Sequence, residues 1–318
     1  MLSKFLDPKN DVAFKKIFGT QKNQDILIHF LNDVLIFKNK SPIREVSFLK
    51  TIQDPETAAS KTSIVDILCK DEKGNTYIVE MQVAAEKGFE KRAQYYASKA
   101  YISQAKSGSI YQDLKEVIFL AIADYVMFPE KKEYKSDHVI LDRKSYEQDL
   151  KDFSFTFIEL PKFTKTIDEL SSLLEKWCYF FKHAEETKES ELKKIVGSDS
   201  ILERAYEELN RFSWNEEELL TYDQMEKYQW AHQASMDKKF EEGESHGLAK
   251  GLAKGRSEGL AEGRSEGLAK GRSEGRAEAI LDTARALLKQ GVDPAVIQSA
   301  TGLSKEEIAS LQAFSKRS

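Results

Sequence analysis

The sequence has only two cysteines, Cys69 and Cys178, among its 318 residues. Two cysteines cannot form a disulfide framework, and together with five scattered histidines they do not match the ligand spacing of a structural zinc site. Long apolar runs are also missing, because the longest candidate, residues 117–128, is interrupted by Asp124. A membrane span needs roughly 20 apolar residues. Since the N-terminus also lacks an apolar leader, we predict a cytoplasmic protein that does not enter a membrane and would bind any metal through oxygen.

A large excess of positive charge is absent as well. Lys and Arg number 48, Asp and Glu number 53, and the net charge is −5. This balance argues against a protein that binds nucleic acid through bulk positive charge. Residues 1–110 nevertheless carry 17 basic and 13 acidic residues, so the N-terminal third can tolerate a phosphate backbone better than the rest of the chain.

The hydrophobic residues, 41% of the chain, recur with periods that predict an α/β fold in the N-terminal half. Helices are predicted over 8–37 and 86–107, and strands over 46–52, 63–70, 77–84, 117–123 and 153–160. This order predicts a mixed central sheet flanked by helices over residues 1–165. A helical extension follows over 166–242, and an all-α region completes the chain.

A glycine repeat occupies residues 243–276. Nine of the chain's 16 glycines stand there at a strict period of four. Each glycine costs a helix about 1 kcal/mol relative to alanine, so a lone helix would lose about 9 kcal/mol. The segment is therefore either a flexible linker or a long helix stabilised by close contact with a second copy or a protein partner. A seam of period four drifts by about 40° per step, so such contact requires right-handed coiling.

Residues 277–318 are predicted to form a small helical module. A helix over 277–289 is followed by a short helix from Asp293, a turn around Gly302, and a last helix capped by Ser304 and Glu307. The pattern resembles a helix-turn-helix. Its second helix carries paired glutamates where a reader of the DNA major groove places Arg, Asn or Gln. Docking to a protein is favoured, and DNA binding is the alternative.

The residues most indicative of chemistry lie on a predicted β-hairpin. The three-residue loop 72–74 matches a type I turn followed by a left-handed glycine. This loop pairs Asp71 with Asn75 and therefore sets Asp66 directly opposite Glu80. A loop of two or four residues would place the two acids on opposite faces, so the register is a sharp prediction.

Two like charges in this position destabilise a sheet unless they share a proton or face a cation. Apolar residues are predicted on the same face as the acids: Ile64, Leu68 and Ile78. These neighbours argue against the alternative of a hairpin face exposed to solvent. Mg²⁺ is the simplest cation to invoke, because it binds one or two carboxylates and completes its shell with water and phosphate oxygens.

Asp66, thirteen intervening residues and the run Glu80-Met81-Gln82 resemble the core of PD-(D/E)XK nucleases, with glutamine in the usual place of lysine. The wider chain is similar to the Rpn family of recombination-promoting nucleases, also described as transposases. The similarity covers about the first 240 residues and is carried by DPKNDVAFKKIFG at 7–19, VDILCKDEKGNTYIVEMQ at 65–82, RAQYYASKAY at 92–101 and FTFIELPKF at 155–163.

The resemblance implies a metal-dependent DNA endonuclease whose breaks promote recombination, with a role in horizontal gene transfer or phage defence, and the paired acids favour Mg²⁺ as the metal. By position, Asp66 and Glu80 would be the catalytic metal ligands and Gln82 the third catalytic residue. Two other functions are open. One is a catalytically inactive, oligomeric interaction protein, and the other is a DNA-binding regulator that acts through residues 277–318.

Glutamine supplies neither the positive charge nor the proton exchange of lysine. The candidate replacements are Lys15 or Lys16 on the first helix, and Arg92 and Lys99 on the helix after the hairpin. Arg92, Tyr96 and Lys99 recur at helical spacing and could form one ridge against DNA. The alternative is that the lysines lie on solvated helix faces and that the tyrosine belongs to the core.

Overall fold

The computed structural model describes residues 3–35, 41–53, 63–105, 108 and 110–315. The chain divides into two compact units, Met1–Ala234 and Ser235–Ser318. The finer domain bounds at 165, 242 and 276 stay a prediction. Among the described residues, no helix is both long enough and apolar enough to cross a bilayer.

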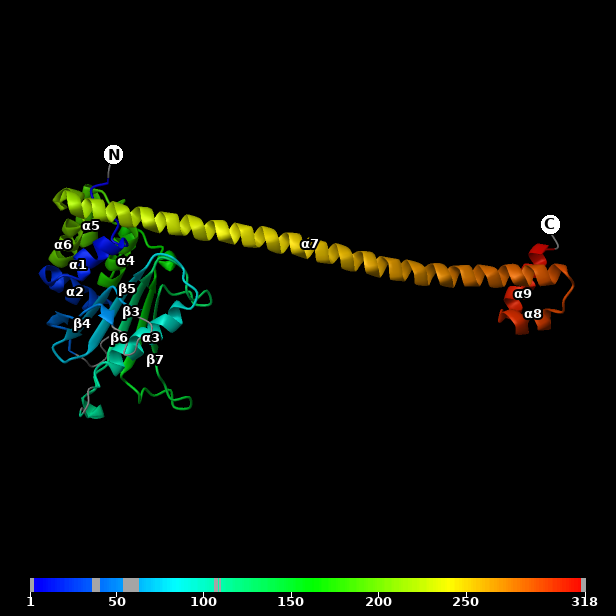
Figure 1. Ribbon diagram of the computed structural model, residues 1–318, viewed down its shortest axis with the longest axis horizontal. Coiled ribbons are helices and arrows are strands. Elements are labelled where there is room, and N and C mark those ends of the chain that lie inside the picture. The colour runs from blue at the N-terminus through cyan, green and yellow to red at the C-terminus, as the bar shows by residue number, and fades with distance from the viewer. Residues whose placement is uncertain (1–2, 36–40, 54–62, 106–107, 109, 316–318) are drawn as a thin grey trace. The chain divides into compact units, whose positions relative to one another are not determined.

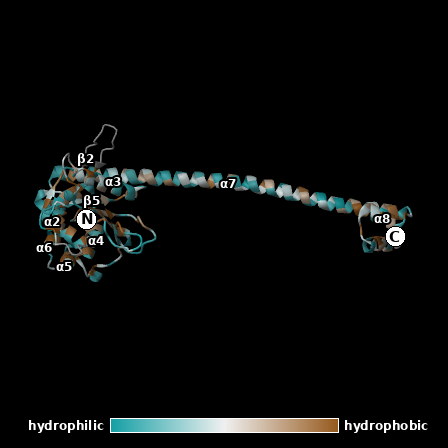
Figure 2. Ribbon diagram, turned by 90° about the horizontal axis from the view of Figure 1, so that it is seen from below, coloured by the Kyte–Doolittle hydropathy of each residue, from teal (hydrophilic) through white to brown (hydrophobic). Residues whose placement is uncertain are grey.

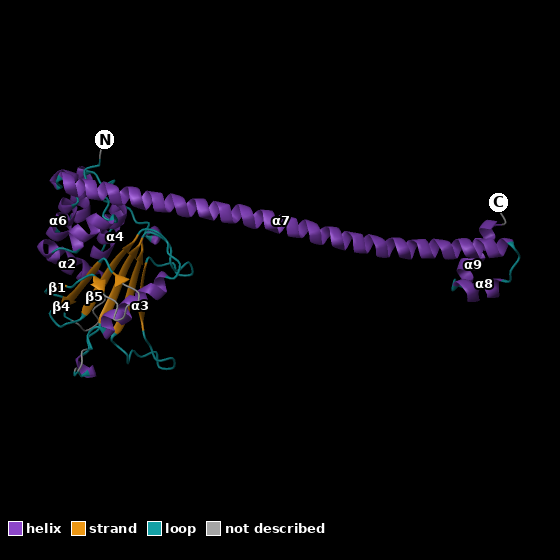
Figure 3. Cartoon of the chain, viewed as in Figure 1, coloured by secondary structure: helices purple, strands orange, loops and turns teal. Residues whose placement is uncertain are grey.

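The first unit is built on a six-stranded mixed sheet, which confirms the predicted α/β fold (Figure 3). The strand order is β1 (Val46–Phe48), β4 (Ile67–Asp71), β5 (Thr76–Gln82), β6 (Val117–Ala123), β8 (Phe153–Glu159) and β7 (Lys135–Val139). The β5–β6 and β6–β8 pairs are parallel, and the other pairs are antiparallel. All seven residues of β6 are buried, as expected for an apolar strand with parallel neighbours on both sides.

Three predictions about strands need correction. The strands predicted over 46–52 and 63–70 are each interrupted, and a separate ladder pairs β2 (Ile52–Gln53) with β3 (Ser63–Ile64). Edge strand β7 was not predicted, because its polar sequence KSDHV lacks the apolar alternation of a buried strand.

Helices cover both faces of the sheet (Figure 1). One face belongs to an apolar cluster that it shares with α1 (Asp11–Phe18), α2 (Gln24–Val34), α4 (Leu173–His183), α5 (Glu189–Val196) and α6 (Ser200–Glu208). The other face packs against α3 (Phe89–Ile102). Short 3-10 turns are η1 (Gln21–Asn23), η2 (Tyr111–Asp113), η3 (Leu160–Lys162), η4 (Ile167–Glu169) and η5 (Arg211–Ser213). Because strand side chains alternate, β5 sends Tyr77, Val79 and Met81 into the first core and Ile78 into the second.

The helix predicted over 8–37 is two helices. Gly19 ends α1, and the Asn23 side chain donates to the Lys16 carbonyl, so the polar run between them forms a turn. The helix predicted over 86–107 is α3, which starts after Gly88 at a φ of +84° and packs its alanines on the sheet. The predicted ends at 36–37 and 106–107 lie outside the described residues.

The glycine repeat lies within one helix, α7 (Glu216–Lys289), which has 74 residues. Figure 2 shows hydrophilic and hydrophobic segments alternating along it. Three i,i+4 ion pairs add support: Lys238–Glu242, Lys254–Glu258 and Lys270–Glu274. A Cβ built on any of the nine glycines would meet no described atom within 4 Å, so the seam is open along its length.

The chain ends with α8 (Pro294–Thr301) and α9 (Lys305–Ser315). Ala284 of α7 packs with Ile297 and Ile308 in a small apolar core. The predicted capping of the last helix is confirmed, because the Ser304 side chain accepts from the Glu307 N–H at 3.2 Å and the Glu307 carboxylate accepts from the Ser304 N–H at 2.7 Å.

Candidate active site

The predicted hairpin register is confirmed. The β4–β5 ladder pairs Ile67 with Val79 and Leu68 with Ile78. Gly74 closes the turn at a φ of +87°, and its N–H donates to the Asp71 carbonyl at 3.0 Å. This geometry needs a left-handed residue at the last loop position, which glycine adopts without a steric penalty.

Asp66 and Glu80 meet at the open end of this hairpin. The Asp66 N–H donates to Glu80 Oε1 at 3.2 Å, and the Met81 N–H donates to Asp66 Oδ2 at 2.9 Å. Each carboxylate thus accepts a backbone N–H from the opposite segment. The expectation that Ile64 shares their face is wrong, because Ile64 is 59% exposed and Val65 packs in the apolar cluster instead.

Both acids are withdrawn from water. Glu80 is 3% exposed, and the Asp66 side chain is 19% exposed. Burial raises the pKa of Glu80, and the neighbouring Asp66 charge raises it further. Burial also raises the pKa of Asp66. The hydrogen bond from the Met81 N–H lowers it, but burial is the larger effect. Near neutral pH the pair therefore favours binding a proton or a cation.

Gln82 connects the acids to a cation. Its Nε2 donates to Glu80 Oε2 at 3.1 Å, and its Oε1 accepts from Arg92 Nη2 at 2.7 Å. Arg92 also forms an ion pair with Glu86. An amide can donate to the carboxylate and accept from the guanidinium at the same time, whereas lysine has no acceptor.

Of the two lysines on α1, only Lys15 is near the acids. Its Nζ lies 3.8 Å from Asp66 Oδ1 and 2.7 Å from Asp11 Oδ1. Burial lowers the pKa of Lys15, but the hydrogen bond to Asp11 and the nearby acids outweigh it and raise the pKa overall. Lys16 is directed elsewhere, toward the side chains of Glu218 and Trp214.

Two further residues of α3 were predicted to contact DNA. The ring of Tyr96 is half-buried, and its centroid lies 5.8 Å from the guanidinium carbon of Arg92. Lys99 lies about one turn further along the helix and is also half-buried. The structure thus brings Tyr96 beside Arg92, and the role of Lys15, Arg92, Tyr96 and Lys99 as DNA contacts stays a prediction.

Sequence reasoning missed three residues around the site. Asp11 could have been found, because its i,i+4 spacing from Lys15 is typical of a helical ion pair. Glu86 left no signal, since it precedes α3 in a loop and meets Arg92 only after folding. Asp124 also left none. Its N–H donates to the Gln82 carbonyl at 2.8 Å and joins the ends of β5 and β6.

The donor set suits a hydrated hard cation. Within the described ranges, no group of three or more His, Cys, Asp or Glu side chains could enclose a metal ion. Asp66 and Glu80 supply two carboxylates that retain unused lone pairs. Mg²⁺ binds to such incomplete protein shells, because it keeps several waters and takes further oxygens from phosphate. The chemistry of the two residues therefore fits a hard divalent cation such as Mg²⁺.

Comparisons with known proteins agree with this geometry. A family model described as PD-(D/E)XK nuclease family transposase matches residues 8–239. A second model, described as the C-terminal HTH domain of the Rpn/YhgA-like nuclease family, matches residues 277–313. Searches of curated proteins and of solved structures gave no significant match.

Proposed function

Because the chain belongs to the PD-(D/E)XK nuclease family transposases and ends in an Rpn/YhgA-like HTH domain, we propose that it is a Mg²⁺-dependent DNA endonuclease. The observation that carries the proposal is the pairing of the buried Glu80 with the half-buried Asp66 across the end of the β4–β5 hairpin. The proposed reaction is hydrolysis of a phosphodiester bond.

Each residue has a distinct part in this proposal. Asp66 and Glu80 would hold the metal, which when bound supplies a Lewis acid next to the scissile phosphate. Gln82 holds the Glu80 carboxylate and the Arg92 guanidinium in fixed positions through its two hydrogen bonds. Arg92 and Lys15 provide the positive charge that the glutamine lacks. Fixed cations of this kind stabilise charge that develops on phosphate.

Binding of DNA would extend along α3 from the acids. Arg92 and Lys99 would neutralise backbone phosphates, while Tyr96 would stack or donate a hydrogen bond. Lys15 would approach from α1 on the other side of Asp66. These contacts are independent of base identity, so the site by itself favours cleavage without strong sequence preference.

The test is plasmid nicking at fixed ionic strength, with Mg²⁺ or with EDTA. We expect Asp66→Asn and Glu80→Gln each to reduce nicking to the EDTA level. Their thermal unfolding midpoints should not fall, because each change removes a buried like charge. Glu90→Gln, an exposed acid in the first turn of α3, is the matched control and should nick normally. Full activity in both site variants would refute the proposal.

A cellular role in recombination would follow from these breaks, and with it a part in horizontal transfer or phage defence. We expect expression of the wild-type chain to raise recombination between marked DNA segments, and Asp66→Asn to abolish the increase. If Asp66→Asn raised recombination as much as wild type does, the effect on recombination would not depend on DNA cleavage.

DNA binding by the C-terminal module is a second proposal, favoured by the match to an HTH domain. The acidic first turn of α9, with Glu306 and Glu307, weakens its attraction to phosphate. We therefore expect Ser235–Ser318 to retard DNA weakly and in a salt-dependent manner. No retardation at low salt would leave the alternative, docking to a protein.

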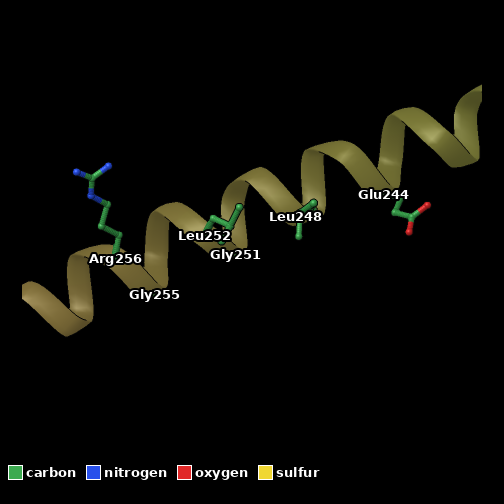
Figure 4. Close-up of a pocket in the computed structure, with 7 residues that line it drawn as sticks. Glu244, Leu248, Gly251, Leu252, Gly255 and Arg256 are labelled. Atoms are coloured by element: carbon green, nitrogen blue, oxygen red, sulfur yellow. The ribbon is translucent and has the colours of Figure 1, made fainter.

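The open seam of α7 favours self-association. Gly251 and Gly255 leave a shallow groove beside Leu248 and Leu252 (Figure 4). A seam that drifts about 40° every ~6 Å stays in contact with a second helix only when the two helices coil around each other in the right-handed sense, and its glycines allow the two backbones to approach closely. Sedimentation equilibrium should show a dimer or larger species that dissociates in Gly251→Leu. A wild-type monomer would exclude this assembly.

A further inference from the structure

Helix α1 carries two adjacent lysines that are held on different sides. Lys15 reaches the acids of the site, and Lys16 reaches the start of α7. Phe14 and Phe18, both fully buried, form the apolar stripe between them. Their rings pack against Phe30 and Phe181, so the apolar face fixes the depth and the approximate orientation of α1. The polar contacts on the flanks can then set the small rotation that remains, and with it where Lys15 points.

The first contact holds the N-terminal end of α1. The Tyr222 hydroxyl of α7 accepts from the Asp7 N–H at 3.0 Å, and the Tyr222 carbonyl accepts from Asn10 Nδ2 at 3.3 Å. Asn10 is the N-cap of α1, and its Oδ1 accepts from the Val12 N–H at 3.0 Å. Because Tyr222 is 1% exposed and Asn10 is 2% exposed, this link between α7 and the cap is shielded from water.

The second contact holds the C-terminal half of α1. Lys16 Nζ lies 4.2 Å from the centroid of the Trp214 ring and forms an ion pair with Glu218. Both partners are themselves fixed. Trp214 Nε1 donates to the Glu208 carbonyl at 2.7 Å, and the Asn215 N–H donates to Glu218 Oε2 at 3.0 Å.

We propose that Lys16 and Tyr222 are positioning residues of the active site, which act by holding α1 so that Lys15 stands beside Asp66. The inference rests on the proposed function. A rotation of α1 by about 10° moves an atom ~6 Å from the axis by about 1 Å. The Lys15–Asp66 separation of 3.8 Å lies at the outer limit of an ion pair, so a shift of this size breaks or remakes it. Misplacement by about 1 Å is enough to reduce a rate by up to ~100-fold.

The experiment is a double-mutant cycle in the full chain. Lys16→Met removes the ammonium but keeps an apolar stem against Trp214, while Lys16→Arg keeps both the charge and the ring contact. We expect Lys16→Met to reduce the rate constant of Mg²⁺-dependent nicking about tenfold, and Lys16→Arg to restore it to within about twofold. In a Lys15→Ala background, Lys16→Met should change the rate by no more than about twofold, because its effect passes through Lys15.

Two variants complete the design. Lys22→Met is the matched control, because Lys22 pairs with Glu208 at 2.7 Å and its side chain is 75% exposed. It should leave the rate unchanged in both backgrounds. Tyr222→Phe removes one hydroxyl without changing the packing, so it should reduce the rate severalfold in the folded protein even where Lys16→Met fails to fold.

A readout that needs no activity separates this inference from the proposed function. Acetylation of the Lys15 amine by a water-soluble acetylating reagent, followed by mass spectrometry, should accelerate severalfold in Lys16→Met and Tyr222→Phe but not in Lys22→Met. If the wild-type chain does not nick DNA, the proposed function fails and the labelling still decides the positioning role. Equal Lys15 reactivity in all variants, or an equal rate loss in both backgrounds of the cycle, would overturn the inference.

Discussion

At the residue scale, the site differs from the motif it resembles by one side chain. Gln82 donates to Glu80 and accepts from Arg92, so its amide connects these two side chains but supplies no charge. The charge is moved to Arg92 and Lys15, which come from two different helices. The result is a site whose electrostatics depend on how α1 and α3 pack, and not on the hairpin alone.

This arrangement predicts the effect of restoring the motif. Gln82→Lys should reduce nicking about tenfold, because the new ammonium would stand beside the Arg92 guanidinium and repel it. In an Arg92→Ala background the same change should increase nicking, since the ammonium then replaces the missing charge. Rate constants at saturating DNA provide the measurement. An increase from Gln82→Lys alone would contradict this account of the glutamine.

A second residue-scale prediction concerns stability and pH. The ring of His29 lies 2.8 Å from Asp33 Oδ2 and 3.2 Å from Asp199 Oδ2. The Asp33 carboxylate beside the ring is the main cause that raises the pKa of His29, against burial, which lowers it, and the charges of Asp199 and Asp25 raise it further. A raised folded pKa stabilises the fold below the unfolded pKa of about 6.5, and this contribution is lost as pH rises through the folded value.

At pH 6 the unfolding free energy of wild type should therefore exceed that of His29→Gln by roughly 1–2 kcal/mol. This difference should narrow by pH 9, and thermal unfolding of the two proteins at both pH values measures it. His138 is the matched control. Burial lowers the pKa of His138, so His138→Gln should show its largest difference from wild type above pH 6.5. A gap for His29 that does not change with pH would exclude the ion pairs as its cause.

At the element scale, the β4–β5 hairpin positions the two acids. Its register depends on one left-handed residue, Gly74, at a φ of +87°. The parallel strand β6 then holds the far edge of β5 in a sheet with both faces covered. If β4 and β5 paired one residue out of register, one of the two acids would face the opposite core. The Gly74 turn that fixes the register therefore also keeps both acids on one face.

Gly74→Ala should accordingly reduce the unfolding free energy by about 1–2 kcal/mol, because alanine resists the left-handed conformation. A Cβ there would also approach Lys115 Cγ at 3.3 Å. Chemical denaturation of the two proteins measures the difference. Gly88→Ala, at a φ of +84° with open space around it, tests whether backbone strain alone explains the loss.

In the glycine repeat, unlike at Gly74, we expect replacement of a glycine by alanine to stabilise the structure. Gly259 is helical and meets no described neighbour within its own chain, so at concentrations where the chain is monomeric Gly259→Ala should stabilise α7 by about 1 kcal/mol and raise its helix content. Circular dichroism of Ser235–Ser318 provides the measurement. If the substitution instead reduces helicity, the helix must depend on contact at the glycine seam.

At the scale of the whole molecule, the candidate site and the HTH match lie in different compact units. Every residue assigned to the site lies in the unit Met1–Ala234, and the HTH match lies in Ser235–Ser318. Because the net charge is −5, the proposed binding of DNA at the site would depend on local cations and not on the molecule's overall field.

Removal of Ser235–Ser318 should therefore leave the rate constant of nicking within about threefold, while the KM for DNA rises by about tenfold and self-association is lost. Kinetics at two salt concentrations, together with sedimentation, test the three effects. A loss of the rate constant itself would show that the second unit contributes to the chemistry.

Several features of this protein could be predicted from short stretches of its sequence. The hairpin register, the apolar strand β6 and the capped last helix follow from turn chemistry and side-chain alternation within a few residues. These features are local, so the information needed to predict them is contiguous in the chain. Family resemblance then indicated Asp66, Glu80 and Gln82 as a set.

Only the tertiary structure decided which cations face the acids. Lys15 and Lys16 are adjacent and chemically identical, and packing of α1 between the sheet and α7 sends one to Asp66 and the other to Glu218. The Glu86–Arg92 pair likewise depends on where a loop docks. Long-range contacts of this kind depend on how whole elements pack, which no local window of sequence contains.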